Sequence, residues 1–285
     1  MTLIEHIREL RSRLLKAVLG ILLFTVVGIY FADRIQHFIN APYCDYKFDQ
    51  TGSAKCDFNS TSILSPFMLQ LKIGLYVGLV LGAPIWLYQL WAFIAPGLHR
   101  RERRFTYAFV AVATPLFLAG ISLAYVVVSK SLHFFLGTTS DNVNLTIDLT
   151  GYFDFVTNMM LLFGAAFEFP LVLVMLNFAG ILSGRRLLRM WRTALFLMFL
   201  FAALVTPTPD PFGMTILALA MAVLYFGAVA VAFINDARRR RNNPYREYDD
   251  DEASPLDTTV GPEAPPEPIA PADRGVWGSR DDGAT

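Results

Sequence analysis

Apolar runs separated by short charged islands make up most of this chain. The uncharged runs are 17–32, 73–98, 105–129, 193–209 and 211–235, and 155–180 contains a single acid. Several of them exceed the roughly 20 apolar residues that cross a ~30 Å hydrocarbon core. In hydrocarbon every backbone polar group needs an internal partner, so runs of this length favour helices over barrel strands. The pattern predicts an all-α membrane protein with six transmembrane helices.

Prolines fall inside three of the predicted helices. Pro84 interrupts the second helix, between about 66 and 94, while Pro115 and Pro170 lie within the third and fourth. A proline inside a helix removes one backbone hydrogen bond and bends the helix axis. Three bent helices predict a concave bundle.

The fifth predicted helix is unusually short. Its apolar run from Trp191 to Val205 spans only about 22 Å at 1.5 Å per residue, less than the ~30 Å core. Segment 206–211 then contains three prolines and cannot continue a helix. We therefore predict that the fifth and sixth helices stop short of the outer surface and thin the bilayer locally.

Charged residues are too few, at 17% of the chain, to cover a soluble surface, and their positions indicate topology. Lys and Arg gather at the N-terminal segment, in two alternate short loops and after the last apolar run, whereas the intervening loops hold few of them. The clusters are Arg8, Arg11, Arg13 and Lys16; Arg100, Arg101, Arg103 and Arg104; Arg185, Arg186, Arg189 and Arg192; and Arg238 to Arg241. By the positive-inside rule both termini are cytoplasmic.

The chain divides into three parts. Residues 1–16 have helical apolar spacing and predict an amphipathic helix at the cytoplasmic interface. Residues 17–235 form the six-helix transmembrane domain, with an outer cap loop at 33–65. Residues 236–285 are polar, acidic and proline-rich, and predict a disordered cytoplasmic tail. The basic start of that tail is interpreted as an anchor near anionic membrane lipid, and no nucleic-acid partner is predicted.

The two cysteines, Cys44 and Cys56, both fall in the predicted outer loop. An oxidising compartment would preserve a disulfide between them, so this pair is a disulfide candidate. The alternative is two reduced thiols in a mobile loop. Two cysteines without a nearby histidine do not predict a metal site.

Catalytic signatures are missing from the sequence. The four histidines fall on different segments without metal-binding spacing, and neither a nucleophile beside a base nor a phosphate-binding loop is present. The sequence therefore predicts that the protein is not an enzyme, holds no cofactor and does not use ATP directly.

Glu168 is the most unusual residue, because an acid inside an apolar run costs at least a few kcal/mol unless it faces a cavity or finds a partner. We considered two interpretations. It has a function in the membrane, or it is a neutral side chain that locks the second and fourth helices together. Gln89, near the cytoplasmic end of the second helix, is a candidate hydrogen-bond partner for it.

Five motifs together resemble those of the TatC family, the polytopic subunit of the twin-arginine, or Sec-independent, protein translocase. They are HIRELRSRL at 6–14, SPF at 65–67, WAFIAPGL at 91–98 with ERR at 102–104, FEFP at 167–170 and TPTPD at 206–210. The resemblance covers roughly 3–235. The cysteine pair and Ala220, in place of a proline common in the last helix, depart from the family pattern.

The resemblance implies that Glu9 and Glu102 bind the twin-arginine signal peptides of folded cargo proteins. Carboxylates suit this task because they form two-point bonds with guanidinium that lysine does not reproduce. Phe93 and Leu98 would line the groove, and Arg11 would support it. The alternative is that Glu9 pairs with Arg13, and Glu102 with its neighbouring arginines.

The resemblance further implies a receptor that assembles the single-span proteins TatA and TatB to export folded proteins across the bacterial plasma membrane, using the proton-motive force. Glu168 would face partners on a concave, partly wetted surface. Thr206 and Asp210 match family positions at the end of the fifth helix and in the outer turn after it, and TatA and TatB would bind near the fifth helix. Several copies of the chain would assemble in the complex. The alternative is a proton-coupled small-solute transporter with Glu168 as proton relay, which predicts more than one buried ionisable group.

Overall fold

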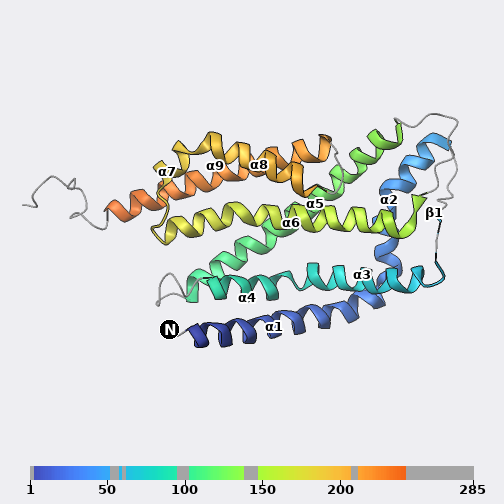
Figure 1. Ribbon diagram of the computed structural model, residues 1–285, viewed down its shortest axis with the longest axis horizontal. Coiled ribbons are helices and arrows are strands. Elements are labelled where there is room, and N and C mark those ends of the chain that lie inside the picture. The colour runs from blue at the N-terminus through green and yellow to red at the C-terminus, as the bar shows by residue number, and fades with distance from the viewer. Residues whose placement is uncertain are drawn as a thin grey trace, which may run out of the picture. The chain divides into compact units, whose positions relative to one another are not determined.

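The computed structural model describes residues 3–51, 58–59, 62–94, 103–137, 147–206 and 211–241, and almost all of them are helical (Figure 1). The helices are α1 (Leu3–Tyr30), α2 (Ala32–Thr51), α3 (Ser65–Leu81), α4 (Ala83–Ile94), α5 (Arg103–Gly137), α6 (Leu149–Phe178), α7 (Gly184–Arg189), α8 (Trp191–Val205) and α9 (Pro211–Arg241). Two short strands, β1 (Phe58–Asn59) and β2 (Ile147–Asp148), pair in parallel.

Helix length and composition agree with the predicted membrane fold. Among the described residues, α1, α5, α6 and α9 are each long and apolar enough to cross a membrane, and the bent pair α3 and α4 makes a fifth if it counts as one span. The all-α membrane class is therefore confirmed. The sixth predicted crossing depends on α8, which is apolar but has only 15 residues. The count of six stays a prediction.

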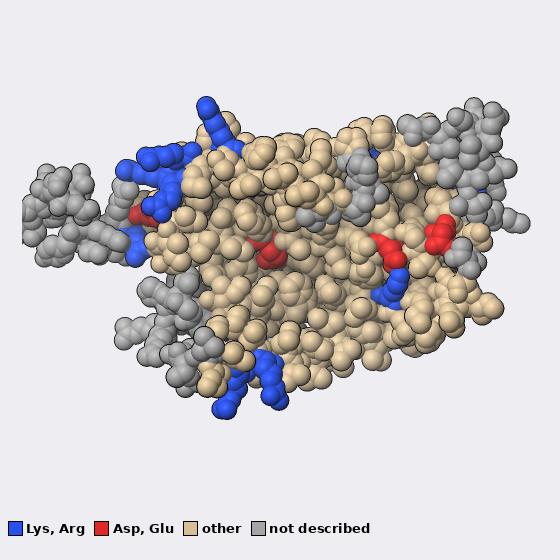
Figure 2. Space-filling model, in the orientation of Figure 1, with Lys and Arg blue, Asp and Glu red and all other residues tan. Residues whose placement is uncertain are grey.

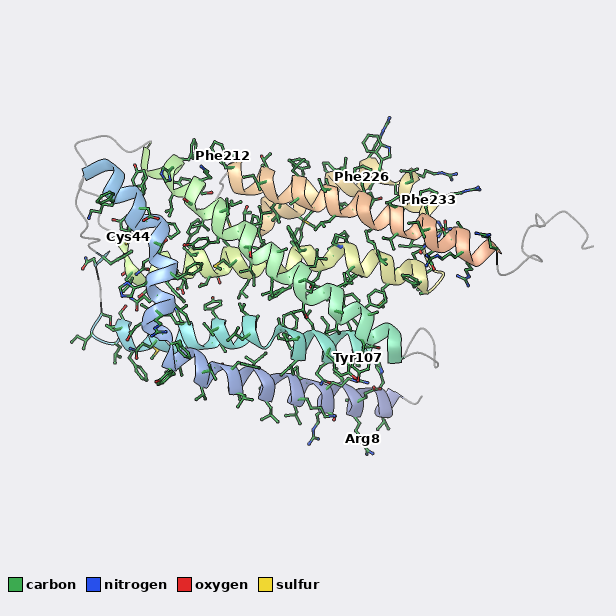
Figure 3. The ribbon with its side chains drawn as sticks, turned by 180° about the vertical axis from the view of Figure 1, so that it is seen from behind. Arg8, Cys44, Tyr107, Phe212, Phe226 and Phe233 are labelled. Atoms are coloured by element: carbon green, nitrogen blue, oxygen red, sulfur yellow. The ribbon has the colours of Figure 1, made fainter. Side chains whose placement is uncertain are left out.

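The exterior of these helices is apolar, as contact with lipid requires. Phe212, Phe226 and Phe233 lie on the outside of α9, each more than a third exposed (Figure 3). Figure 2 shows most of the Lys and Arg atoms toward the end where α1 begins and α9 ends, while the middle of the same face is largely uncharged. This distribution is typical of a membrane protein with its basic residues at one boundary.

Close packing between helices depends on glycine at two places. α1 lies along α3 and α4, and a Cβ at Gly78 would lie 2.6 Å from the carbonyl oxygen of Ile21. α5 packs along α6, and a Cβ at Gly120 would lie 2.6 Å from the carbonyl oxygen of Phe163. Small residues let backbones approach in lipid, where packing replaces the hydrophobic effect as the driving force.

The predicted interruption at Pro84 is confirmed as a 58° bend between α3 and α4. The Gly82 N–H still donates to the Gly78 carbonyl at 2.9 Å, and the Trp86 indole donates to the Leu79 carbonyl at 2.9 Å. These bonds satisfy carbonyl groups near the break. Pro115 and Pro170, by contrast, lie inside α5 and α6, which both continue through them.

The segment predicted as an outer cap loop, 33–65, is helical over most of its length. α2 buries Ile39 and Tyr43 on one face, and the ring of Tyr43 contacts Tyr152 of α6. The Tyr152 hydroxyl donates to the Ile39 carbonyl at 2.8 Å. A helix with only one apolar face in an otherwise polar segment is easily missed, which explains why the sequence analysis assigned no helix here.

A buried polar network joins the C-terminal ends of α6 and α9 to the start of α7. The Asn177 side chain, 1% exposed, donates to the Leu182 carbonyl at 2.8 Å and to Asp236 Oδ1 at 2.9 Å. The other oxygen of Asp236 accepts from the Gly184 N–H at 2.7 Å. Since each of these groups has a partner, the network fixes the end of α9 at low cost.

Candidate functional site

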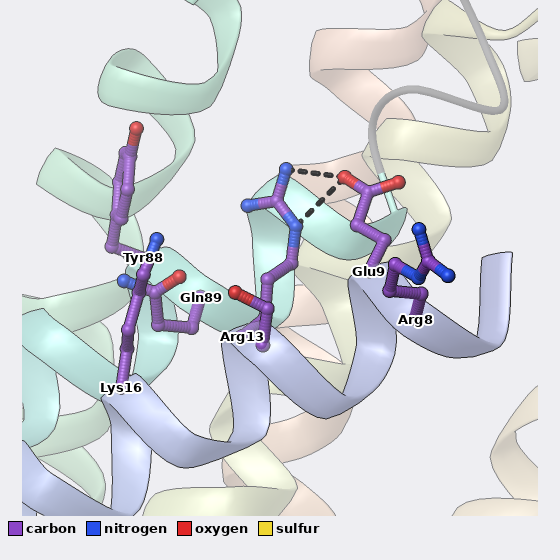
Figure 4. Close-up of a pocket in the computed structure, with 7 residues that line it drawn as sticks. Arg8, Glu9, Arg13, Lys16, Tyr88 and Gln89 are labelled. Carbon is purple, nitrogen blue, oxygen red and sulfur yellow. Dashed lines mark hydrogen bonds and ion pairs between the residues drawn. The ribbon is translucent and has the colours of Figure 1, made fainter. Parts of the chain in front are cut away.

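A pocket of about 500 Å³ lies between α1 and α4 (Figure 4). Its walls come from one face of α1 and from the side of α4 that faces it. The lining residues are Arg8, Glu9, Ser12, Arg13, Lys16, Tyr88 and Gln89. Helical spacing explains the set, because residues four apart on α1 share a face. The pocket contains Glu9, the first residue that the sequence analysis assigned to peptide binding.

Glu9 has a partner within the protein. Arg13 donates from both Nε and Nη2 to Glu9 Oε1, at 2.9 and 2.6 Å, and the two side chains are about one quarter exposed. The predicted alternative, an i,i+4 ion pair between Glu9 and Arg13, is therefore confirmed in this structure. A ligand that uses the Glu9 carboxylate must share or displace Arg13.

Phe93 lies near this pocket, on the last turn of α4. Its ring stacks on that of His6 from α1, with centroids 4.6 Å apart and an interplanar angle of 26°. Arg11 is exposed on α1 and does not line the pocket. Leu98 and Glu102 lie outside the described residues. The structure thus brings Glu9 and Phe93 to neighbouring positions, and the sequence analysis had not assigned His6 to the site.

Glu168 lies in the C-terminal half of α6, a helix that does not contribute to the lining of this pocket. Both of its carboxyl oxygens are shielded from solvent and lack a hydrogen-bond partner among the described residues. The buried indole of Trp91 interacts with this carboxyl group, but not within hydrogen-bond geometry, so Trp91 Nε1 is unsatisfied as well. Buried polar groups without a hydrogen bond are costly inside a protein. The contact joins α4 to α6, so both interpretations of Glu168, a function in the membrane and a lock between the two helices, stay predictions.

The expected hydrogen bond between Gln89 and Glu168 was wrong. Gln89 lines the pocket beside α1, and the Glu168 oxygens accept no hydrogen bond from any described residue. Leu87 and Trp91 are both buried and fix the rotation of α4 about its axis. Gln89 is two residues from each of them, or about 200° around a helix with 3.6 residues per turn, so it faces the other way.

Three polar pairs between α3 and α6, which we call the polar ladder, escaped the sequence analysis. The Lys72 ammonium contacts both oxygens of Asp154 at 2.7 and 2.8 Å. The other two pairs are Ser65 with Thr150, at 2.6 Å, and Tyr76 with Asn158, at 2.9 Å. Polar residues at 150, 154 and 158 of α6 and at 72 and 76 of α3 have helical spacing. That spacing was the signal that could have revealed them.

The remaining candidate residues lie toward other parts of the chain. Cys44 lies on α2 (Figure 3) and is disulfide-bonded, while Cys56, its candidate partner, lies outside the described residues. Thr206 is the C-cap residue directly after α8, and its hydroxyl donates to the Ala202 carbonyl at 2.8 Å. Asp210 lies outside the described residues. The assigned roles of Thr206 and Asp210 therefore stay predictions.

Several crossing helices, an apolar exterior and basic residues at one end define a multi-pass membrane protein. A family model described as Sec-independent protein translocase protein (TatC) matches residues 5–219. The chain is 43% identical over 281 residues to TatC of Frankia casuarinae, covering 95% of this chain and 76% of that protein. It is 36% identical over 224 residues to TatC of Escherichia coli K12, covering 78% and 84%.

A solved structure is similar as well. The crystal structure of a protein described as the twin arginine translocase receptor TatC has a TM-score of 0.65 at 27% identity, covering 80% of this chain and 98% of that one. The chain therefore belongs to the TatC family of Sec-independent protein translocase proteins. Members of this family are components of protein transport rather than enzymes, and the predicted resemblance is confirmed.

Proposed function

We propose that this chain is the receptor subunit of a twin-arginine translocase and binds twin-arginine signal peptides through the Glu9 carboxylate. The observation that carries the proposal is the contact of Arg13 with Glu9 through Nε and Nη2. A carboxylate that holds one guanidinium in this way offers the same bonds to a guanidinium from a peptide. Lysine has no planar pair of donors, so the site would discriminate between the two residues.

The other site residues extend this proposal. By the family resemblance, Glu102 would supply a second carboxylate for the second arginine of the peptide, and Leu98 would add an apolar contact. Phe93, held by its stacking on His6, provides an apolar wall beside the pocket. Arg11 supports the site from the exposed side of α1. Both chain ends lie on the cytoplasmic side of the bacterial plasma membrane, where the cargo is made.

Export itself uses residues outside the lining of this pocket. TatA and TatB assemble near the short helix α8, close to Thr206 and Asp210, and Glu168 faces a partner. A 15-residue helix is about 22 Å long and thins the bilayer, which lowers the barrier to a folded cargo. The proton-motive force supplies the energy, and several copies of the chain act in one complex.

Peptide binding to the purified full-length protein tests the receptor role. We expect the affinity for a synthetic Arg-Arg signal peptide to be at least about tenfold higher than for its Lys-Lys version, a difference of ~1.4 kcal/mol or more in binding free energy. Glu9→Gln and Glu102→Gln should each weaken the Arg-Arg peptide and reduce this difference. Asp33→Asn, which changes an exposed acid on α2, is the matched control and should bind as the wild type does.

Equal binding of the two peptides by the wild type would reject the receptor proposal. Binding that both glutamate variants leave unchanged would reject these residues as the site. The solute-transporter alternative predicts more than one buried ionisable group, and among the described residues the buried polar side chains besides Tyr are Ser131, Thr157 and Asn177, none of which relays protons as a carboxylate does. Family membership also favours protein export.

A further inference from the structure

We propose that the pocket between α1 and α4 binds the phosphate of an anionic phospholipid headgroup, held by Lys16, Arg13 and Gln89. The pocket is the one that contains Glu9. The lipid site itself does not depend on the receptor role, whereas its consequence for peptide binding rests on the proposed function. The two are tested separately.

The charge of the pocket favours an anion. Among the described residues, its lining holds three cations, Arg8, Arg13 and Lys16, and one carboxylate, Glu9, which together carry a net of two positive charges. Arg13 already neutralises Glu9. Neither Arg8 nor Lys16 forms an ion pair or hydrogen bond with any described residue, so their charges are available to a ligand.

The donors of the pocket suit a phosphate. Arg13 uses Nε and Nη2 for Glu9, which leaves its Nη1 group free to donate. Figure 4 shows the ends of Lys16 and Gln89 close to each other, on the side of Arg13 away from Glu9. An ammonium, an amide and part of a guanidinium together provide several N–H groups, which match the acceptor oxygens of a phosphate.

The surroundings favour a lipid over a free phosphate. Lys16 is the last charged residue before the uncharged run 17–32, so it marks the boundary between headgroups and hydrocarbon. Leu19 and Leu23 follow it at i+3 and i+7, on the same face of α1, and each is 65% exposed. An acyl chain attached to the bound phosphate would lie along these leucines and bury them.

Lipid binding has a consequence for the receptor. In the structure a peptide guanidinium meets a Glu9 carboxylate that Arg13 already occupies. A phosphate beside Arg13 offers this arginine a second anionic partner, so that Glu9 becomes available to the peptide. The anionic lipid would thus prepare the pocket for a twin-arginine peptide.

Lipid retention by the full-length protein tests the site without any peptide. The protein is equilibrated with equal amounts of phosphatidylglycerol and phosphatidylcholine, and the lipids that stay bound are measured by native mass spectrometry. We expect phosphatidylglycerol to be retained in preference. Lys16→Gln should lower its affinity about fivefold, the effect of removing one cation near an anionic lipid. Lys16→Arg should retain the preference, as should Lys130→Gln, which changes an exposed lysine of α5 outside the pocket.

Three results would overturn the lipid site. Equal retention of the two lipids by the wild type would remove the role of headgroup charge. An equal loss in Lys16→Gln and Lys130→Gln would assign the preference to general surface charge. Displacement of phosphatidylglycerol by millimolar inorganic phosphate would identify a soluble anion as the ligand.

The consequence for peptide binding is tested in nanodiscs that contain either phosphatidylcholine alone or a mixture with phosphatidylglycerol. We expect the Arg-Arg peptide to bind more tightly in the mixture, and Lys16→Gln to remove this gain. A Lys-Lys peptide reports the general attraction of a cationic peptide to the membrane. If the gain is the same for both peptides, the preparation of Glu9 by lipid is refuted. If the Arg-Arg and Lys-Lys peptides bind equally under all conditions, the receptor proposal fails instead.

Discussion

Two acidic side chains on α6 differ in their partners. Asp154 contacts Lys72 through both oxygens, and the two side chains are each 39% exposed. Glu168 has both oxygens shielded and no hydrogen-bond partner among the described residues. The two acids are 14 residues apart, or about 21 Å along the helix axis. One helix therefore carries a paired acid and an unsatisfied one.

We infer from this difference that Asp154 has a structural role and propose a functional one for Glu168. A paired acid contributes to the contact between α3 and α6 and needs nothing further. An unsatisfied acid at membrane depth lowers stability, and such residues persist where a partner or ligand uses them. We therefore expect changes at Asp154 to affect mainly stability, and changes at Glu168 to affect mainly export.

The largest effect is expected for Glu168→Leu. Removing two unsatisfied oxygens should raise the free energy of unfolding by about 1–3 kcal/mol, because each buried group without a partner is costly. Export of a twin-arginine reporter should fall by about tenfold or more, equivalent to ~1.4 kcal/mol of lost partner binding. Unfolding of the purified protein in detergent and export by cells that depend on this chain measure the two quantities.

Phe169→Leu is the matched control, because Phe169 is the next residue on α6 and is 44% exposed. This variant should export as the wild type does. Normal export by Glu168→Leu would show that the unsatisfied acid has no function and would remove the distinction between the two acids.

A smaller effect is expected at the ion pair of the polar ladder. Asp154→Leu should lower the free energy of unfolding by about 1 kcal/mol, since the pair is partly exposed and the change leaves Lys72 without its partner. Adding Lys72→Met should recover most of this loss, which a double-mutant cycle measures. Losses that simply add would mean that the two residues are not coupled, and a loss of export without a loss of stability would assign Asp154 a function.

The smallest effect is expected at the next pair of the ladder. Tyr76→Phe removes the hydroxyl that donates to Asn158 at 2.9 Å. Because Asn158 is exposed, the free energy of unfolding should fall by only about 0.5 kcal/mol. Tyr30→Phe, at a tyrosine that is 84% exposed, is the control and should have no effect. A loss above about 2 kcal/mol, beyond the usual range for one such bond, would make this pair the principal link between α3 and α6.

Local chemistry made much of the fold predictable. Pro84 cannot donate its backbone nitrogen, and the helix breaks there, with a bend of 58°. The prolines after residue 205 predicted the end of α8, and the described helix ends at Val205. α2 was not predicted, because its buried face, which includes Ile39 and Tyr43, is recognisable only once α6 lies against it.

The candidate site was predictable where neighbours in sequence meet, and less so elsewhere. Glu9 and Arg13 are one helical turn apart, so their pairing was foreseen as an alternative. Lys72 and Asp154 are 82 residues apart, and their contact depends on how two helices face each other. The same limit explains why the expected hydrogen bond between Gln89 and Glu168 was wrong. The rotation of α4 about its axis follows from the burial of Leu87 and Trp91 rather than from any local signal.

The bend between α3 and α4 also determines how force passes through the molecule. Trp86 donates to the Leu79 carbonyl across the break, and the Gly82 N–H donates to the Gly78 carbonyl. These two hydrogen bonds restrict changes in the angle between α3 and α4. When that angle is fixed, a rotation of α4 also rotates α3. For α3, with 17 residues, a tilt of about 5° moves the far end by about 2 Å over a lever of ~26 Å. A ligand that displaces α4 at the pocket beside α1 would thus also move the far end of α3.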